Sequence, residues 1–424
     1  MNGPRTGSAA RQVSRRSVLA GLAAVSLAGV TAACGAPGGS GGGAAAGGSA
    51  DGPITWWDYS EPGTTADTWL AMLKEYQDTH PGTAVERRFV AYADIKKVLL
   101  QSAGAGALPD VVVINGPDHQ QFAELGIAAD LTARVDAWGQ LDKYPPGVID
   151  SARWEGKLYG LPAEANCLGL FYDVDALGAA GLTPPTTWEE LRAAARQLTT
   201  GDRFGLAFAA PNNQQAVFQW LPTLWQAGGD LRDLTTPAAE KALRFRVDLM
   251  NDGSVSREAL GWDQSQVGTE FAQGRAAMMI NGPWIQPALE QEGPDRNWQV
   301  ALLPHDVEEA SCTGGENYLI VNGPRQDKAW DLVTWMQDPE RIARICAATG
   351  NLPTRTDVPP PDSPATQVFI EQLKVARPRA YGPNYPQISD AVTVALQAAF
   401  TGTASPADAL RTAAQAIQPL LPPE

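Results

Sequence analysis

The stretch Asp110-Val111-Val112-Val113-Ile114 decides the fold, because four consecutive apolar side chains are typical of a strand that is buried on both faces. Upstream, residues 54–57 and 85–90 predict two further strands. Apolar residues at helical spacing follow each of them, over 68–78 and 95–103. This alternation of strand and helix predicts a parallel α/β sheet near the start of the folded chain.

Downstream, strands and helices continue to alternate. Thr187 and Glu190 are spaced as a capping box, which indicates the start of a helix. No period of 20 to 50 residues repeats, which argues against a solenoid. The expected strands cover residues 160–173, 205–209, 276–281, 299–303 and 318–321, and the expected helices cover 186–198, 215–226, 237–251, 328–337, 340–348, 364–375, 389–400 and 406–418.

The composition is that of a folded, acidic protein. Of the 424 residues, 44% are hydrophobic and 19% are charged, which suits two lobes with separate cores. The net charge of −15 disfavours nucleic acid as a partner, because both molecules would be negative. Three scattered histidines and the absence of a C-x-x-C spacing in the sequence predict no metal and no cofactor. Among Cys167, Cys312 and Cys346, at most one disulfide is possible.

The N-terminal residues resemble a bacterial lipoprotein signal. Residues 14–19 have a twin-arginine pattern, an apolar stretch follows over 18–30, and small residues precede Cys34. The apolar stretch is about half of the roughly 20 residues that span a bilayer, which disfavours a permanent transmembrane helix. We therefore expect residues 1–33 to be removed and Cys34 to carry lipid, including palmitate. The Gly-, Ala- and Ser-rich residues 34–52 would tether the protein to the extracytoplasmic membrane face, with the lipid as its only membrane contact.

Several segments, all in one order along the chain, carry a family resemblance. The most specific is the stretch FAQGRAAMMINGPW over residues 271–284, and residues 109–111, 161–173, 184–191 and 384–389 also fit. Together they resemble the extracellular solute-binding proteins of bacterial ABC importers, in the carbohydrate branch that includes maltose-binding protein. The resemblance spans residues 53–420.

The resemblance implies a two-lobed α/β fold of the periplasmic-binding-protein or Venus-flytrap type, in which each lobe is a sheet flanked by helices. Lobe 1 would comprise 53–165 and 270–313, and lobe 2 would comprise 166–269 and 314–424. The chain would cross between lobes near 164–168, 264–271 and 312–317. Lobe closure would trap a carbohydrate, expected to be a di- or oligosaccharide, and a monomer would deliver it to the membrane permease subunits without chemistry.

A sugar site combines aromatic rings, which stack on C–H faces, with polar groups that pair with hydroxyls. By the resemblance, Trp284 is the stacking ring, with a core tryptophan as the alternative. Polar residues that follow the first and third strands lie at the edge where α/β sheets bind ligands. The candidate ligand-binding residues are Asp58, Tyr59, Ser60, Glu61, Asn115, Glu164, Asn166, Trp225, Trp284, Gly314, Gly315, Arg355, Tyr381 and Tyr385.

Several of these residues have plainer interpretations. Ser60 would also serve as a helix N-cap, Trp225 as helix core, and the pair Gly314 and Gly315 as a simple turn. Buried unpaired acids are costly, so Glu164 should be exposed, paired or awaiting a hydroxyl. The chain lacks the charged pair and the aromatic residue that maltose-binding protein has after its first and third strands, and it has Ser60-Glu61 and Ile114 there, so maltose itself is not inferred.

Two other functions stay open at this point. A glycerophosphodiester carrier would need cationic donors at the phosphate, and Arg355 and Arg379 are available for that purpose. A membrane-anchored glycoside hydrolase would need two carboxylates, which Asp58, Glu61 and Glu164 would supply. No hydrolase motif accompanies these three acids.

Overall fold

The computed structural model describes residues 49–422, so the expected signal segment, Cys34 and most of the tether lie outside the described residues. The first lobe is built on a five-stranded sheet with the strand order β2-β1-β3-β12-β6. Strands β1 (Ile54–Asp58), β2 (Val85–Phe89) and β3 (Val111–Asn115) run parallel, as the sequence predicts. Strand β3 is buried along its whole length. Strand β12 (Glu316–Ile320) is antiparallel to both β3 and β6 (Gly160–Pro162).

The core of the first lobe lies between this sheet and helices from both ends of the chain. Trp56 on β1, Trp69 on α1 and Tyr318 on β12 form a mutual aromatic contact, with ring centroids 5.6 to 6.0 Å apart. Burial of such rings is a dominant contribution to core stability. The helices are α1 (Thr64–Thr79), α2 (Ile95–Ala105), α3 (His119–Glu124), α4 (Thr132–Trp138), α5 (Pro146–Ile149), α12 (Gln326–Met336) and α13 (Pro339–Thr349).

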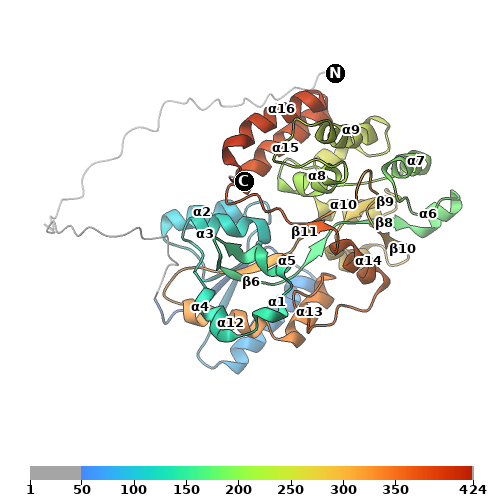
Figure 1. Cartoon of the computed structure of the whole chain (residues 1–424). Coiled ribbons are helices and arrows are strands. Elements are labelled where there is room, and N and C mark those ends of the chain that lie inside the picture. Colours follow the sequence, from blue (N-terminus) through green and yellow to red (C-terminus); the bar gives the residue numbers. More distant parts are fainter. Residues whose placement is uncertain (1–48, 423–424) are drawn as a thin grey trace, which may run out of the picture. The chain divides into compact units, whose positions relative to one another are not determined.

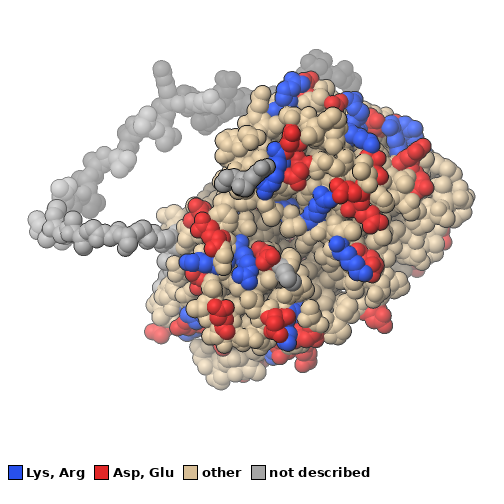
Figure 2. Space-filling model, in the orientation of Figure 1, with Lys and Arg blue, Asp and Glu red and all other residues tan. Residues whose placement is uncertain are grey.

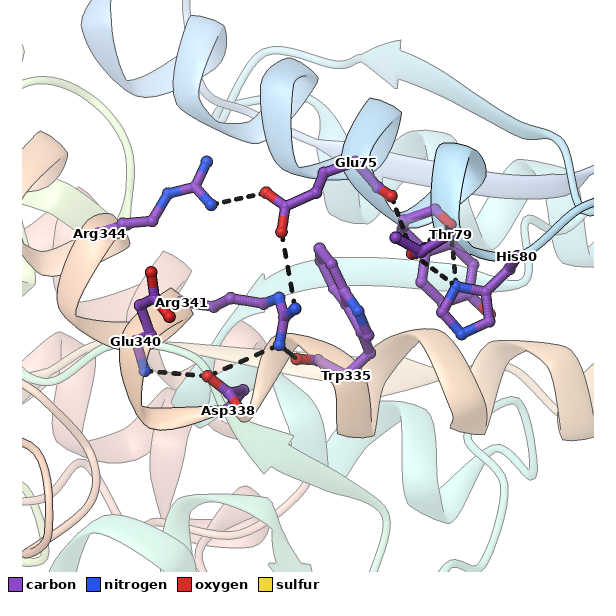
Figure 3. A network of polar contacts seen from close by, with 9 residues as sticks. Glu75, Thr79, His80, Trp335, Asp338, Glu340, Arg341 and Arg344 are labelled. Carbon is purple, nitrogen blue, oxygen red and sulfur yellow. Dashed lines mark hydrogen bonds and ion pairs between the residues drawn. The ribbon is translucent and has the colours of Figure 1, made fainter.

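Helices α12 and α13 are linked to α1 by a network of polar side chains, which lies next to buried apolar side chains (Figure 3). The Glu75 carboxylate on α1 forms ion pairs with Arg344 at 2.7 Å and with Arg341 at 3.6 Å. The Arg341 guanidinium lies 3.6 Å from the ring centroid of Trp335. Exposed ion pairs contribute about 0 to 1 kcal/mol each, so the burial of Leu332 on α12 and its apolar neighbours is the larger contribution.

The second lobe contains a three-stranded antiparallel sheet, β10 (Trp298–Ala301), β8 (Gly169–Asp173) and β9 (Met278–Asn281). The expected strand over 205–209 makes only isolated bridges, including Ala207 to Met279. In Figure 1, α15 and α16 pack side by side next to α9. The helices of this lobe are α6 (Val174–Ala179), α7 (Trp188–Leu198), α8 (Gln214–Gln226), α9 (Pro237–Asn251), α10 (Gln264–Ala272), α11 (Gln286–Glu292), α14 (Pro364–Leu373), α15 (Tyr385–Thr401) and α16 (Pro406–Ile417).

Local sequence signals set several helix ends. The capping box at the start of α7 is present, with the Thr187 hydroxyl accepting from the Glu190 amide and the Glu190 carboxylate accepting from the Thr187 amide. Pro237 and Pro406 stand at the first position of α9 and α16, where the missing N–H costs nothing. Within residues 49–422 we find no helix with the length and apolarity to cross a bilayer.

A third, small sheet lies where the chain passes between the lobes. Its strands are β13 (Ala376–Arg377), β11 (Ser311–Gly314) and β7 (Asn166–Cys167), in that order. Strand β6 of the first sheet leads through residues 163–165 into β7, and β11 leads through Gly315 into β12. A further passage follows α13, where Leu352 and Ala165 exchange backbone hydrogen bonds of 2.8 and 3.0 Å.

The expected division of the chain into lobes needs correction. Residues 264–271 do not cross between lobes, because they form most of α10, which packs against β9. The segments 270–313 and 314–424 were expected in lobe 1 and lobe 2. Instead, β9 and β10 pair with β8 of the second lobe, whereas β12 pairs with β3 of the first. Strand pairing joins residues far apart in sequence, and the local pattern carries little information about it.

Position 315 requires a glycine, because of its backbone conformation and because of the atoms packed around it. Its φ is +129°, and a Cβ there would lie 2.2 Å from the Glu164 carbonyl oxygen. We predict that Gly315→Ala lowers the free energy of unfolding by about 2 kcal/mol or more. Urea denaturation measures the change.

Gly104 in α2 provides the matched control, because a Cβ there would meet nothing within 4 Å. Gly104→Ala should be neutral or stabilising by up to about 1 kcal/mol. Equal effects of the two substitutions would contradict a tight crossing at Gly315.

Candidate functional site

A cavity of about 140 Å³ lies where the two crossing segments meet. The first lobe contributes residues 116–117, 147–148 and 150–151, the crossing segments contribute residues 164–165 and 313–315, and residues 378–380 also line the cavity. The cavity therefore brings together three of the residues predicted from the sequence: Glu164, Gly314 and Gly315.

Two carboxyl groups lie at this crossing. Glu164 is 7% exposed, and its Oε2 accepts a hydrogen bond from Asn351 Nδ2. Glu316 Oε1 accepts from the Tyr59 hydroxyl at 2.9 Å, while its Oε2 is buried with no hydrogen-bond partner in the described residues. Burial, followed by the charge of Glu316, raises the pKa of Glu164 above its usual value. Burial also raises the pKa of Glu316, although the hydrogen bond from Tyr59 and the charge of Arg379 oppose this effect.

Arg379 lines the opposite side of the cavity and is only 5% exposed. Its Nη2 donates to Asn115 Oδ1 at 3.1 Å, and its guanidinium carbon lies 4.6 Å from the ring centroid of Phe218. Its Nε and Nη1 are buried and have no partner among residues 49–422. Buried donors that lack an acceptor are costly, so Arg379 is a candidate binding residue of this cavity.

In the loop after β1, the buried polar group makes hydrogen bonds to the protein itself. The Asp58 carboxylate is fully buried and accepts from Arg87 at 2.6 and 2.7 Å, from Trp56 Nε1 at 2.9 Å and from the Ser60 amide at 2.8 Å. Asp58 therefore has a structural role, which corrects its prediction as a ligand-binding group. The alternative of Ser60 as a helix cap is also wrong, because the N-cap of α1 is Gly63.

The other residues of that loop divide between the crossing and the surface. The Tyr59 hydroxyl reaches Glu316 and keeps its proton, because burial and the charge of Glu316 raise the pKa of Tyr59. Glu61 is exposed and does not line the cavity. The predicted acids Asp58, Glu61 and Glu164 are thus not brought together, as a hydrolase pair would require, since Glu164 alone lines the cavity.

The aromatic candidates separate into one half-buried ring and a buried group. Trp284 is partly exposed, and its ring lies over Gly282, where a Cβ would approach it to 1.9 Å. The Trp284 ring centroid is 6.1 Å from that of Phe218. Phe218 also lies 3.2 Å from where a Cβ on Gly314 would be, so the two rings form an aromatic wall beside the crossing, although neither ring lines the cavity itself.

Three other predicted residues are part of the protein interior. Trp225 is 1% exposed in the core of the second lobe, and its Nε1 donates to the Tyr381 hydroxyl at 3.3 Å. Tyr381 in turn donates to Asp230 at 3.0 Å and stacks with the buried Tyr385. The helix-core interpretation of Trp225 is therefore correct, and its prediction as a second stacking ring is wrong.

Arg355 also lies outside the cavity. Its guanidinium donates to the Asp357 carboxylate at 2.8 and 2.9 Å and to Gln140 Oε1 at 2.7 Å. These partners satisfy it locally, which removes it as a candidate for binding a phosphate. Asn166, by contrast, lies at the crossing in β7, with its Oδ1 only 2.1 Å from where a Cβ on Gly314 would be.

Sequence reasoning missed Glu316, Asn351 and Phe218 and underrated Arg379. Glu316 follows Gly314-Gly315 directly, and this glycine pair was the available signal that polar groups there approach another segment closely. No local pattern marks Phe218 or Asn351. Cys167, Cys312 and Cys346 are buried free thiols. Within residues 49–422 no group of three or more His, Cys, Asp or Glu could hold a metal ion.

Charges of both signs are interspersed on the face of the molecule in Figure 2. A second hollow, of about 250 Å³, lies between α9 and the turn that joins α15 to α16. None of the predicted site residues lines that hollow. The crossing, with its buried unmet donors and acceptors, is therefore the candidate site.

Comparison with known proteins gives the class to which this fold and cavity belong. Residues 71–370 match the family model described as bacterial extracellular solute-binding protein, and the chain belongs to this family. A putative binding protein of Brucella abortus is 23% identical over 82% of this chain and 89% of its own length. An uncharacterised lipoprotein of Streptomyces antibioticus is 28% identical over 72% of each chain.

Solved structures share the two-lobed fold. An ABC transporter solute-binding protein of Thermotoga lettingae, bound with α-D-tagatose, has a TM-score of 0.82 and 26% identity, covering 87% of this chain and 100% of that one. The UgpB protein of Mycobacterium tuberculosis, in complex with glycerophosphocholine, has a TM-score of 0.77 and 21% identity, covering 87% and 98%. The protein is therefore a solute-binding protein of the maltose-binding-protein-like fold of carbohydrate ABC importers.

The assignment of Trp225 to the core has a direct test. Trp225→Ala removes a fully buried ring and should lower the free energy of unfolding by about 3 to 5 kcal/mol. Trp284→Ala, at a partly exposed ring, should cost below about 2 kcal/mol. Chemical denaturation of both variants measures this, and the reverse order would contradict the assignment.

Proposed function

We propose that the protein binds a carbohydrate, a di- or oligosaccharide, at the crossing between its lobes and delivers it to an ABC permease. The observation that carries this proposal is the pairing of unmet groups around one cavity. Arg379, which lines the cavity, has two buried N–H donors without a partner, and Glu316, which directly follows the cavity-lining Gly315, has a buried acceptor oxygen without one. A sugar hydroxyl donates one hydrogen bond and accepts others, so a polyhydroxyl ring satisfies both kinds of group.

The aromatic wall supports the same class of ligand. Trp284 and Phe218 are neighbouring rings beside the glycine-rich crossing, and Trp284 is partly exposed. Aromatic faces stack on the C–H faces of sugar rings. The cavity of about 140 Å³ then holds one sugar unit, and the exposed Trp284 ring provides a surface for a second.

The proposed setting is the outer face of the cell membrane. The twin-arginine pattern and Cys34 support export and lipid attachment, and the Streptomyces relative is named a lipoprotein. We propose that the lipid on Cys34 is the only membrane anchor and that the protein works as a monomer. Its role is delivery, and it performs no chemistry on the bound solute.

A phosphodiester is the rival ligand, because Arg379 is a buried cation and the UgpB neighbour is a glycerophosphocholine complex. That neighbour is 21% identical, and this likeness supports a shared fold but not a shared ligand. The two carboxyl groups beside the cavity disfavour an anion there. The carbohydrate is therefore the preferred ligand.

A thermal-shift screen of residues 49–424 against mono-, di- and oligosaccharides and glycerophosphodiesters tests the proposal. A sugar at 100 times its Kd should stabilise the fold by about 2.7 kcal/mol, because it binds only the folded state. Calorimetry should then show that Trp284→Ala weakens binding at least about tenfold, the effect of losing roughly 1.4 kcal/mol of stacking contact.

Leu70→Ala is the control, because Leu70 is an exposed apolar residue on α1 outside the cavity. It should bind sugar as the unaltered protein does. Stabilisation by phosphodiesters alone would contradict a carbohydrate ligand. Disappearance of the sugar during incubation, followed by NMR, would contradict a role in transport alone.

A further inference from the structure

Glu164 and Glu316 come from different parts of the chain and meet through their backbones. The Glu316 carbonyl oxygen accepts from the Ala163 amide at 2.7 Å and from the Glu164 amide at 3.3 Å. Glu164 lies between β6 and β7, and Glu316 is the first residue of β12. The two passages between the lobes therefore hold Glu164 and Glu316 on adjoining segments, and Glu164 lines the cavity.

No cation forms an ion pair with either carboxyl group in residues 49–422. Their side-chain contacts there are with neutral groups, Asn351 and Thr349 for Glu164 and the Tyr59 hydroxyl for Glu316. This differs from the buried carboxylates Asp58 and Asp110, which pair with Arg87 at 2.6 Å and Arg325 at 2.8 Å. A cation at 2.6 or 2.8 Å stabilises an ionised carboxylate, and the two glutamates lack that stabilisation.

Two buried carboxylates that interact cannot both ionise cheaply, and the usual result is one retained proton. Burial is the largest influence on both groups, and the negative charge of Glu316 adds to it for Glu164; both pKa values are raised. The other titratable groups that act on the pair, directly or by their charge, are Tyr59, Tyr92, Tyr318, Cys346 and Arg379.

Arg379 is the one cation of this set. Its positive charge lowers the pKa of Glu316 and partly opposes the effect of burial. One proton on the carboxyl pair leaves a charge of −1, which the +1 of Arg379 balances. Asp150 also lines the cavity and pairs with Arg153 at 3.1 Å, so the surroundings of the cavity are then close to neutral, and they contain both donors and acceptors.

Resting on the proposed carbohydrate function, we propose that Glu164 and Glu316 share one proton at neutral pH and thereby make the cavity select neutral polyhydroxyl ligands over anionic ones. The protonated carboxyl donates a hydrogen bond and the ionised one accepts, which matches the dual character of a hydroxyl. An acidic sugar brings a second negative charge beside the ionised carboxyl, and Arg379 is already balanced. A sugar acid is therefore disfavoured although a guanidinium lines the cavity.

The shared proton has a signature that needs no ligand. A carboxyl group with a raised pKa in the folded state binds a proton that the unfolded chain has released, so stability is lost as the pH rises through the folded pKa. The free energy of unfolding should therefore decline from about pH 4.5, near the unfolded pKa of Glu, to about pH 8, near the raised pKa of Glu164. Glu316→Gln removes one member of the pair and should reduce that decline by at least half, and Glu164→Gln is the second variant if the first folds poorly.

Glu86→Gln is the control, because Glu86 is an exposed residue of β2 in the same lobe. Its decline with pH should equal that of the unaltered protein. If the free energy of unfolding of both Glu316→Gln and Glu164→Gln declines with pH as fully as that of the unaltered protein, the shared proton is disproved.

Selectivity is measured by calorimetry with matched probes: glucose and glucuronate, galactose and galacturonate, maltose and maltobionate. The neutral member of a bound pair should bind at least about tenfold more tightly, and Glu316→Gln should narrow this preference to within about threefold. Equal affinity for both members would overturn this inference and leave the proposed function standing. Failure of every neutral mono-, di- and oligosaccharide to bind would overturn the proposed function, while the pH profile would still decide the shared proton.

Discussion

The close approach of the two crossing segments is the constraint on which the rest of the structure depends. Gly314 and Gly315 lie so near Glu164 and Asn166 that a Cβ on either glycine would come within 2.1 or 2.2 Å of an oxygen atom. This contact lets β12 enter the first sheet directly after β11 has paired with β7. It also places Glu316 directly after Gly315, which lines the cavity. The same few residues therefore join the lobes and form the site.

The elements of the fold were largely predictable, whereas their assembly was not. The apolar run over 111–114 lies in the buried strand β3, Val111–Asn115, and α9 begins and ends as its sequence predicts, because these signals are local. The pairing of β12 with β3, and of β9 with β8, joins residues about 100 or more positions apart. A period-two or helical pattern contains no information about such a partner, and the predicted lobe boundaries failed for that reason.

The site was predictable where glycine or family resemblance marked it. Glu164, Gly314 and Gly315 line the cavity, and Trp284 lies close to its aromatic wall. Asp58 was predicted to bind a ligand, but it pairs with an arginine of the next strand. A polar residue at a strand end looks the same in sequence in both cases. Arg355 failed similarly, since Asp357 two residues later neutralises it. Only the residues that surround a charged group in space show whether it has a structural role or is available to bind a ligand.

A crystal structure of the protein with the sugar found by thermal screening would show where the ligand binds. Sugar oxygens should lie within about 3 Å of Arg379 Nε or Nη1 and of a carboxyl oxygen of Glu164 or Glu316. The same structure should place a sugar face against Trp284. A sugar bound in the hollow between α9 and the turn from α15 to α16, with the Arg379 donors still unpartnered, would contradict the account.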